Sequence, residues 1–152
     1  MNSYGVFRGV MGLEGHIMSN FSFLLGQDDY EQFAIPCVEA EKAFSISPTM
    51  CAMATRKAFE LAVKWVYAAD RSIQCQYRDN LQSLIPTNPL RTRDRQPEML
   101  DSFQYIVKAG NITVHGKTRI SPKDAMFDLK LLFVFIQWID YSYGKWYEKR
   151  VF

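Results

Sequence analysis

The sequence predicts an all-helical domain, and three observations support that prediction. Apolar residues recur three and four positions apart in several segments, which is the spacing of one face of a helix. Two of these segments begin with serine followed by proline, Ser47-Pro48 and Ser121-Pro122, as is typical of a helix N-cap and first helical position. No convincing pair of strand-like segments is present, so a helical bundle is the economical fold.

The first expected helix extends from about Asp29 to Phe44, and Pro36 either kinks it or marks its true first turn. Its apolar contacts would come from Phe33, Val38, Ala40 and Phe44.

The second expected helix begins after Ser47 and ends near Asp70. Its spacing predicts one buried stripe made of Met50, Ala54, Ala58, Leu61, Ala62, Trp65 and Val66.

The sequence of the second half of the chain predicts a short helical turn, a loop and two more helices. One short helical turn is expected at 80–85, and the proline-rich stretch 86–97 is expected to be a surface loop. A helix then begins at Pro97, and Gly110 ends it. The last helix begins after Ser121 and ends at Tyr143, before Gly144. Its apolar positions are Ala125, Met126, Leu129, Leu132, Phe133, Ile136 and Ile139.

The domain organisation expected from these elements is simple. Residues 1–17 are glycine-rich and form a flexible leader, a remnant of cloning or sequence upstream of the natural start. Residues 18–147 form the helical bundle, and residues 148–152 begin a linker to a downstream region.

The amino-acid composition limits which classes of function and location the sequence predicts. Eighteen basic residues against sixteen acidic ones leave a net charge of +2, too balanced to indicate nucleic-acid binding by itself. Three cysteines without a CxxC pair predict reduced, mostly buried thiols, and two histidines do not supply a zinc site, so no metal or cofactor is expected. The most apolar run, 129–139, is about half the length of a membrane span, so we expect a soluble, cytoplasmic protein.

The candidate catalytic residues are Lys108, Asn111 and His115, at a helix end and the polar turn after it. Histidine can act as a general acid or base, a cation can stabilise a phosphate transition state, and asparagine can orient the scissile group. The structural alternative, which the spacing favours, is that Asn111 caps a helix and His115 makes a hydrogen bond between helices.

Two other features have both a binding and a structural interpretation. Arg91, Arg93 and Arg95 could contact phosphates, although such a run is usually a solvated loop. The C-terminal aromatic residues could stack on bases, or they could close the bundle and meet a neighbouring domain. They are Trp138, Tyr141, Tyr143, Trp146 and Tyr147.

Several segments, in order, resemble one known domain. Met18-Ser19-Asn20-Phe21-Ser22-Phe23-Leu24 resembles the opening of type I restriction-enzyme R (motor/nuclease) subunits that carry an extra N-terminal helical domain. Gly110-Asn111-Ile112-Thr113-Val114-His115 is similar to that domain's most specific motif. Further similar segments are 40–44, 47–51, 56–61 and 125–144, so the resemblance covers roughly 18–147. It implies a HEPN-like bundle of four to five helices.

The resemblance implies a non-catalytic accessory domain of a type I restriction-modification endonuclease, whose parent protein would be an ATP-dependent, site-specific deoxyribonuclease. Its partners would be downstream helicase and nuclease domains and other restriction-complex subunits. Some HEPN domains are metal-independent ribonucleases that act as dimers and use an arginine and a histidine. Here Lys108 stands where that arginine would be, and lysine cannot make the planar bidentate phosphate contact. The alternatives are therefore a dimeric ribonuclease and a non-catalytic nucleic-acid-binding module.

Overall fold

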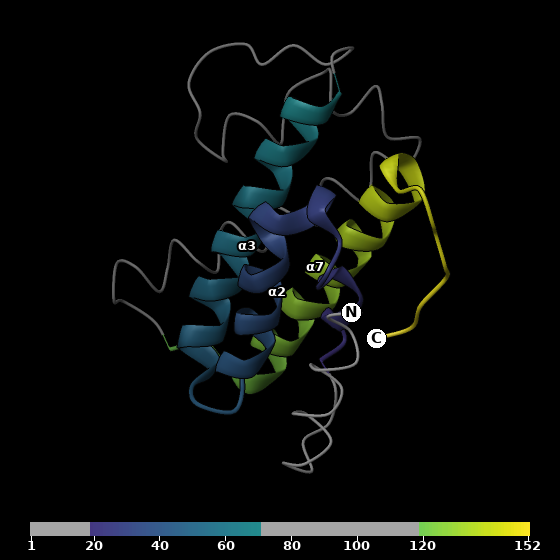
Figure 1. Cartoon of the computed structure of the whole chain (residues 1–152). Helices are drawn as coiled ribbons and strands as arrows, with labels where there is room; N and C mark the ends of the chain where they lie inside the picture. The colour runs from purple at the N-terminus through teal and green to yellow at the C-terminus, as the bar shows by residue number, and fades with distance from the viewer. Residues whose placement is uncertain (1–18, 71–118) are drawn as a thin grey trace.

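The computed structural model describes residues 19–70 and 119–152, and this part of the chain is helical without strands (Figure 1). Two 3-10 turns, η1 (Ser22–Leu24) and η2 (Asp28–Tyr30), precede α2 (Glu31–Ala43) and α3 (Pro48–Ala69). The last helix is α7 (Pro122–Tyr143). The all-helical prediction is confirmed for the described residues, whereas the turn, loop and helix expected between 80 and 110 lie outside them.

The helices α2 and α3 form an antiparallel hairpin, and α7 packs parallel to α3 (Figure 1). Ring contacts establish the directions. Trp65 near the end of α3 packs on Phe33 near the start of α2, with ring centroids 5.7 Å apart. Phe59 and Trp65 of α3 contact Phe135 and Tyr143 of α7 in the same order. Both α3 and α7 therefore begin at one end of the bundle, called here the N-cap end, and both finish at the opposite end, the C-terminal end.

The helix starts expected at the two Ser-Pro pairs are confirmed. The Ser47 hydroxyl accepts a hydrogen bond from the Met50 amide, and the Ser121 hydroxyl accepts one from the Asp124 amide at 3.1 Å. Each bond satisfies an amide that has no partner within its own helix. Gly144 follows α7, as expected.

Pro36 lies inside α2 and does not mark its first turn, because η2 and Glu31 precede it without a break. Proline at this position removes one backbone hydrogen bond. Buried side chains on both sides, Phe33 and Cys37 among them, hold the segment in the core. Tertiary packing thus outweighs the local preference against proline.

The buried face of α3 differs from the expected stripe. Ala58, Ala62 and Val66 are buried as expected, but Met50 is half-exposed and Trp65 is only partly buried. The stripe is rotated by about one residue, and its other members are Cys51, Ala52, Thr55, Phe59 and Val63.

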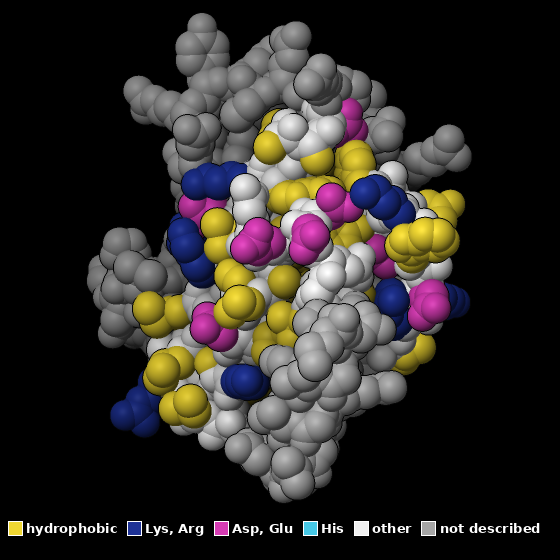
Figure 2. Space-filling model, viewed as in Figure 1, with side chains coloured by type: hydrophobic (Ala, Val, Ile, Leu, Met, Phe, Trp, Pro, Cys, Tyr) yellow, Lys and Arg dark blue, Asp and Glu magenta, His cyan; other side chains and the backbone are white. Residues whose placement is uncertain are grey.

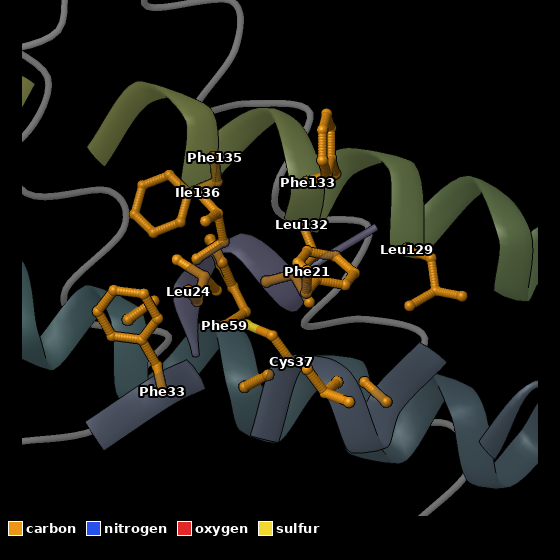
Figure 3. Close-up of a cluster of buried hydrophobic side chains, with 14 of the residues drawn as sticks. Phe21, Leu24, Phe33, Cys37, Phe59, Leu129, Leu132, Phe133, Phe135 and Ile136 are labelled. Atoms are coloured by element: carbon orange, nitrogen blue, oxygen red, sulfur yellow. The ribbon is translucent and has the colours of Figure 1, made fainter. Parts of the chain in front are cut away.

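The core lies between the three helices and the segment before α2 (Figure 3). Phe21 and Leu24 from the N-terminal segment, Phe33 from α2 and Phe59 from α3 are completely buried. From α7, every expected apolar position except the partly buried Met126 belongs to this core. Burying each large side chain contributes about 1.5–3 kcal/mol, so this cluster is the main source of stability in the described part.

Candidate functional site

The residues singled out from the sequence lie outside the described part of the chain. Lys108, Asn111 and His115, and likewise Arg91, Arg93 and Arg95, fall between residues 70 and 119. Their catalytic, structural and phosphate-binding interpretations remain predictions. The polar and aromatic features that the structure does describe are at the two ends of the bundle and along the C-terminal segment.

A hydrogen-bonded network at the C-terminal end of the bundle centres on Asp140, which is completely enclosed. The Tyr30 hydroxyl donates to Oδ1 of Asp140 at 2.8 Å, and Nη1 of Arg150 donates to Oδ2 at 3.2 Å. Burial and the bond to Asp140 both raise the pKa of Tyr30, so this phenol stays protonated and remains a donor. Both oxygens of the buried carboxylate are therefore paired.

The same network fastens the C-terminal segment 144–152 to the bundle. The Arg150 amide donates to Gln137 of α7, and the Arg150 guanidinium lies 4.1 Å from the centre of the Phe23 ring. At the end of the segment, the Phe152 ring packs edge-on against Phe133. Charge pairing and ring contacts together hold this segment against α7, so we assign the Asp140 network a structural role.

A second structural anchor holds the chain before α2. Glu41 of α2 accepts hydrogen bonds from the Ser19 hydroxyl and from both the amide and the side chain of Asn20. These bonds fix the start of the described segment on the surface of α2. The donors are neutral, and Glu41 forms no ion pair with a described residue.

Asp128, near the N-cap end of α7, is a buried acid with an unpaired carboxyl oxygen. Its side chain is 3% exposed, and its Oδ2 has no hydrogen-bond partner. Burial, and secondarily the charge of Asp124 one turn earlier, raise the pKa of Asp128 to about 7. Burial raises the pKa of Cys51 in α3 to about 11, and the negative charge of Asp128 contributes to that rise. The carboxyl group thus lies in the seam between α3 and α7.

A carboxyl group with a pKa near neutrality has the proton affinity that a general acid or base needs. Such a residue must also reach a substrate, and Asp128 is enclosed by the helices that surround it. Among residues 19–70 and 119–152, no group of three or more potential metal ligands is present. Because its carboxyl group is enclosed, we treat Asp128 as a proton-binding group of the fold.

The aromatic residues near the C-terminus divide into two sets. Trp138 and Tyr143 point into the bundle: Trp138 stacks on Phe135, and Tyr143 packs edge-on against Trp65. Tyr141, Trp146 and Tyr147 are 71%, 84% and 40% exposed. Closing of the bundle is therefore confirmed for two rings, whereas base stacking and contact with a neighbouring domain stay predictions for the three rings that face outward.

The outward-facing rings, Tyr141, Trp146 and Tyr147, are named here the aromatic surface. Tyr141 and Tyr147 contact each other edge-on with centroids 5.3 Å apart. Figure 2 shows hydrophobic side chains beside both basic and acidic ones at the edge of the molecule where the C-terminal segment runs in Figure 1. Because Arg150 and Phe152 anchor that segment, the rings are presented on a fixed backbone.

Comparisons with models of known protein families, with curated proteins and with solved structures found no match to the chain. In the described part of the structure, no helix has the length and apolarity required to cross a membrane.

Sequence reasoning missed the two buried aspartates of α7, although the sequence holds a signal for both. Asp128 is three residues after Ala125 and four before Leu132, and both of those belong to the apolar face. Asp140 is four residues after Ile136 on the same face. An acid at a core position of an amphipathic helix needs a partner or a proton, so this spacing marks both residues.

Proposed function

We propose that the chain is an accessory domain of a type I restriction-modification endonuclease R subunit, with a HEPN-like bundle of four to five helices, and that the domain itself is not catalytic. The ordered resemblance from 18 to 147 supports the family, and the helical architecture of the described part agrees with it. Its role is to contact the motor and nuclease domains of the same protein or the other subunits of the complex.

The observation that supports an interaction role most directly is the aromatic surface. Tyrosine and tryptophan are enriched at the centres of protein interfaces, because they bury a large apolar area and lose little conformational entropy. Trp146 is 84% exposed, and it lies on a segment that is already anchored to α7. The cost of ordering that segment is therefore met before any partner binds.

The charges along this segment favour a protein partner over a polyanion. Arg150 is paired with Asp140 and lies 3.6 Å from Glu148, and Lys145 is paired with Asp29. Lys149 is the remaining cation of the segment. Nucleic-acid binding depends on several uncompensated cations, which this surface does not provide.

The coding sequence around the chain gives the first test. We expect helicase and nuclease domains in the same reading frame, and genes for the other restriction subunits beside it. A stop codon directly after Phe152 with no such genes nearby would refute the proposed family.

The second test concerns the surface. The full-length protein carrying Tyr141→Ala and Trp146→Ala is expected to assemble with its restriction subunits at least tenfold more weakly, as measured by sedimentation velocity, because hot-spot aromatic residues contribute about 2 kcal/mol or more each. Ile46→Ala is the matched control, since Ile46 is an equally exposed apolar residue at the opposite end of the bundle. Unchanged assembly of the double variant would show that this surface is not the interface.

A further inference from the structure

Three acidic groups lie towards the N-cap end of the bundle, which also carries the cations Lys42, at the end of α2, and Lys123, at the start of α7. Glu41 comes from α2, and Asp124 and Asp128 come from α7. None of the three forms an ion pair with a described lysine or arginine. From α3 the facing titratable group is Cys51, whose pKa is raised by burial and further by the charges of Asp128 and Glu41. Asp124 is the charged group that raises the pKa of Asp128, so ionisation of Asp128 places a second negative charge one turn away from it.

The position of Asp128 makes that charge hard to solvate. The residue lies on the buried face of α7 together with Ala125, Leu129 and Leu132, which are completely buried. Its Oδ2 accepts no hydrogen bond. A protonated carboxyl group fits such an environment with a modest desolvation penalty, whereas an ionised one without a partner is strongly disfavoured. The seam between α3 and α7 is therefore best packed when Asp128 carries a proton.

We propose that Asp128 makes the packing of α7 against α3 sensitive to pH near neutrality, so that the N-cap ends of the two helices pack closely when the carboxyl group is protonated and separate more readily when it ionises. This inference goes beyond the proposed function and does not depend on the partner of the domain. Its consequence is a bundle whose N-cap end opens more often in mildly alkaline than in mildly acidic solution.

The direction of the effect on stability follows from proton binding. The pKa of Asp128 is about 7 in the folded chain, above its ordinary value of 3.8, so the folded state binds more protons than the unfolded state between these two values. Stability is therefore greatest below the ordinary value, falls as pH rises towards 7, and levels off above it. Between pH 5 and pH 8 the unfolding equilibrium constant is expected to rise roughly a hundredfold through this one group.

Urea denaturation of the full chain at pH 5 and pH 8 tests the proposal, with Asp128→Asn as the variant. The difference in pH dependence between wild type and variant is expected to be roughly a hundredfold in the unfolding constant, or about 2.7 kcal/mol. Asp124→Asn is the matched control: it removes an exposed acid from the preceding turn of α7 and should retain most of the pH dependence. An Asp128→Asn variant with the wild-type pH dependence would overturn the proposal.

A measurement on the wild type keeps the proposal testable if the variant does not fold. Amide hydrogen exchange, corrected for the intrinsic effect of pH, is expected to show more frequent opening at pH 8 than at pH 5 for residues 125–132 of α7. The corresponding change is expected to be smaller in residues 136–143, at the Asp140 end of the same helix. Opening that responds equally along α7, or not at all, would contradict the inference.

Discussion

Two aspartates on one helix, Asp128 and Asp140, are almost equally buried and differ in their partners. Asp140 receives hydrogen bonds from Tyr30 and Arg150, so both of its oxygens are paired. Asp128 has an Oδ2 with no partner and an acid one turn away. One end of α7 therefore contains a satisfied buried charge, and the other contains a carboxyl group that is disfavoured when ionised.

The difference teaches that burial alone does not decide what a charged residue contributes to a fold. An enclosed carboxylate with a cation and a hydroxyl donor can join distant segments, as Asp140 joins the chain before α2 to the C-terminal segment. The same group without donors destabilises the folded state whenever it ionises.

The largest effect is expected from Asp140→Ala. It leaves the Arg150 guanidinium, which is largely buried, without its main partner and removes the acceptor of Tyr30. Breaking a buried pair in this way is expected to lower the free energy of unfolding by about 3 kcal/mol, measured by urea denaturation. A loss below about 1 kcal/mol would show that the network contributes little.

Gly144→Ala is expected to have the next largest effect. A Cβ at this position would overlap the carbonyl and Oδ1 oxygens of Asp140 and lie 2.8 Å from the Tyr30 hydroxyl. The resulting displacement is expected to lower the free energy of unfolding by about 1–3 kcal/mol. Lys145→Ala, at the exposed neighbouring residue, serves as the control and should change stability by less than about 0.5 kcal/mol. Equal effects at the two positions would argue against the close approach.

Tyr30→Phe tests the neutral donor of the network alone. The ring contacts of Tyr30 with Phe33 and Trp65 remain possible, while Oδ1 of Asp140 loses its hydrogen bond. A loss of about 1–2 kcal/mol in thermal or urea denaturation is expected. Tyr141→Phe removes a hydroxyl from a largely exposed ring and should have almost no effect. If Tyr30→Phe leaves the free energy of unfolding unchanged, the hydrogen bond from Arg150 alone is sufficient for Asp140.

The smallest effect is expected from Glu148→Gln. Glu148 is mostly exposed, and its carboxylate lies 3.6 Å from Nη2 of Arg150. Exposed pairs of this kind contribute no more than about 0.5 kcal/mol, because solvent screens them. A larger loss, measured by urea denaturation at low salt, would mean that Arg150 depends on the exposed acid as well as on the buried one.

The sequence predicted the features that local chemistry determines. Serine before proline fixed the starts of α3 and α7, and the spacing of Leu129, Leu132 and Ile136 identified the buried face of α7. The buried face of α3 was misplaced because most of its residues are small and carry little directional information, namely Cys51, Ala52, Thr55, Ala58 and Ala62. The hydrogen bond between Tyr30 and Asp140 could not be predicted, because the two residues are 110 positions apart. Only the packing of α2 and α7 on α3 brings them together.

The candidate site was predictable to a smaller extent. The catalytic and basic residues chosen from the sequence, from Arg91 to His115, stay predictions because they lie outside the described residues. The aromatic run was recognised, but whether a ring points inward or outward depends on its angle around α7 and on the turn at Gly144. The sequence spacing places Asp128 on the apolar face of α7, so its burial could have been predicted. Its lack of a hydrogen-bond partner depends on the neighbouring helices.

The central claim is that partners, and not burial, decide the sign of a buried aspartate's contribution. One experiment tests it directly: the urea midpoints of Asp128→Asn and Asp140→Asn measured at pH 8, where Asp128 is mostly ionised because its pKa is about 7. We expect the midpoint of Asp128→Asn to rise above that of the wild type, since a disfavoured charge is removed, and the midpoint of Asp140→Asn to fall, since Arg150 loses its charged partner. Midpoints that shift in the same direction for both variants would contradict the account.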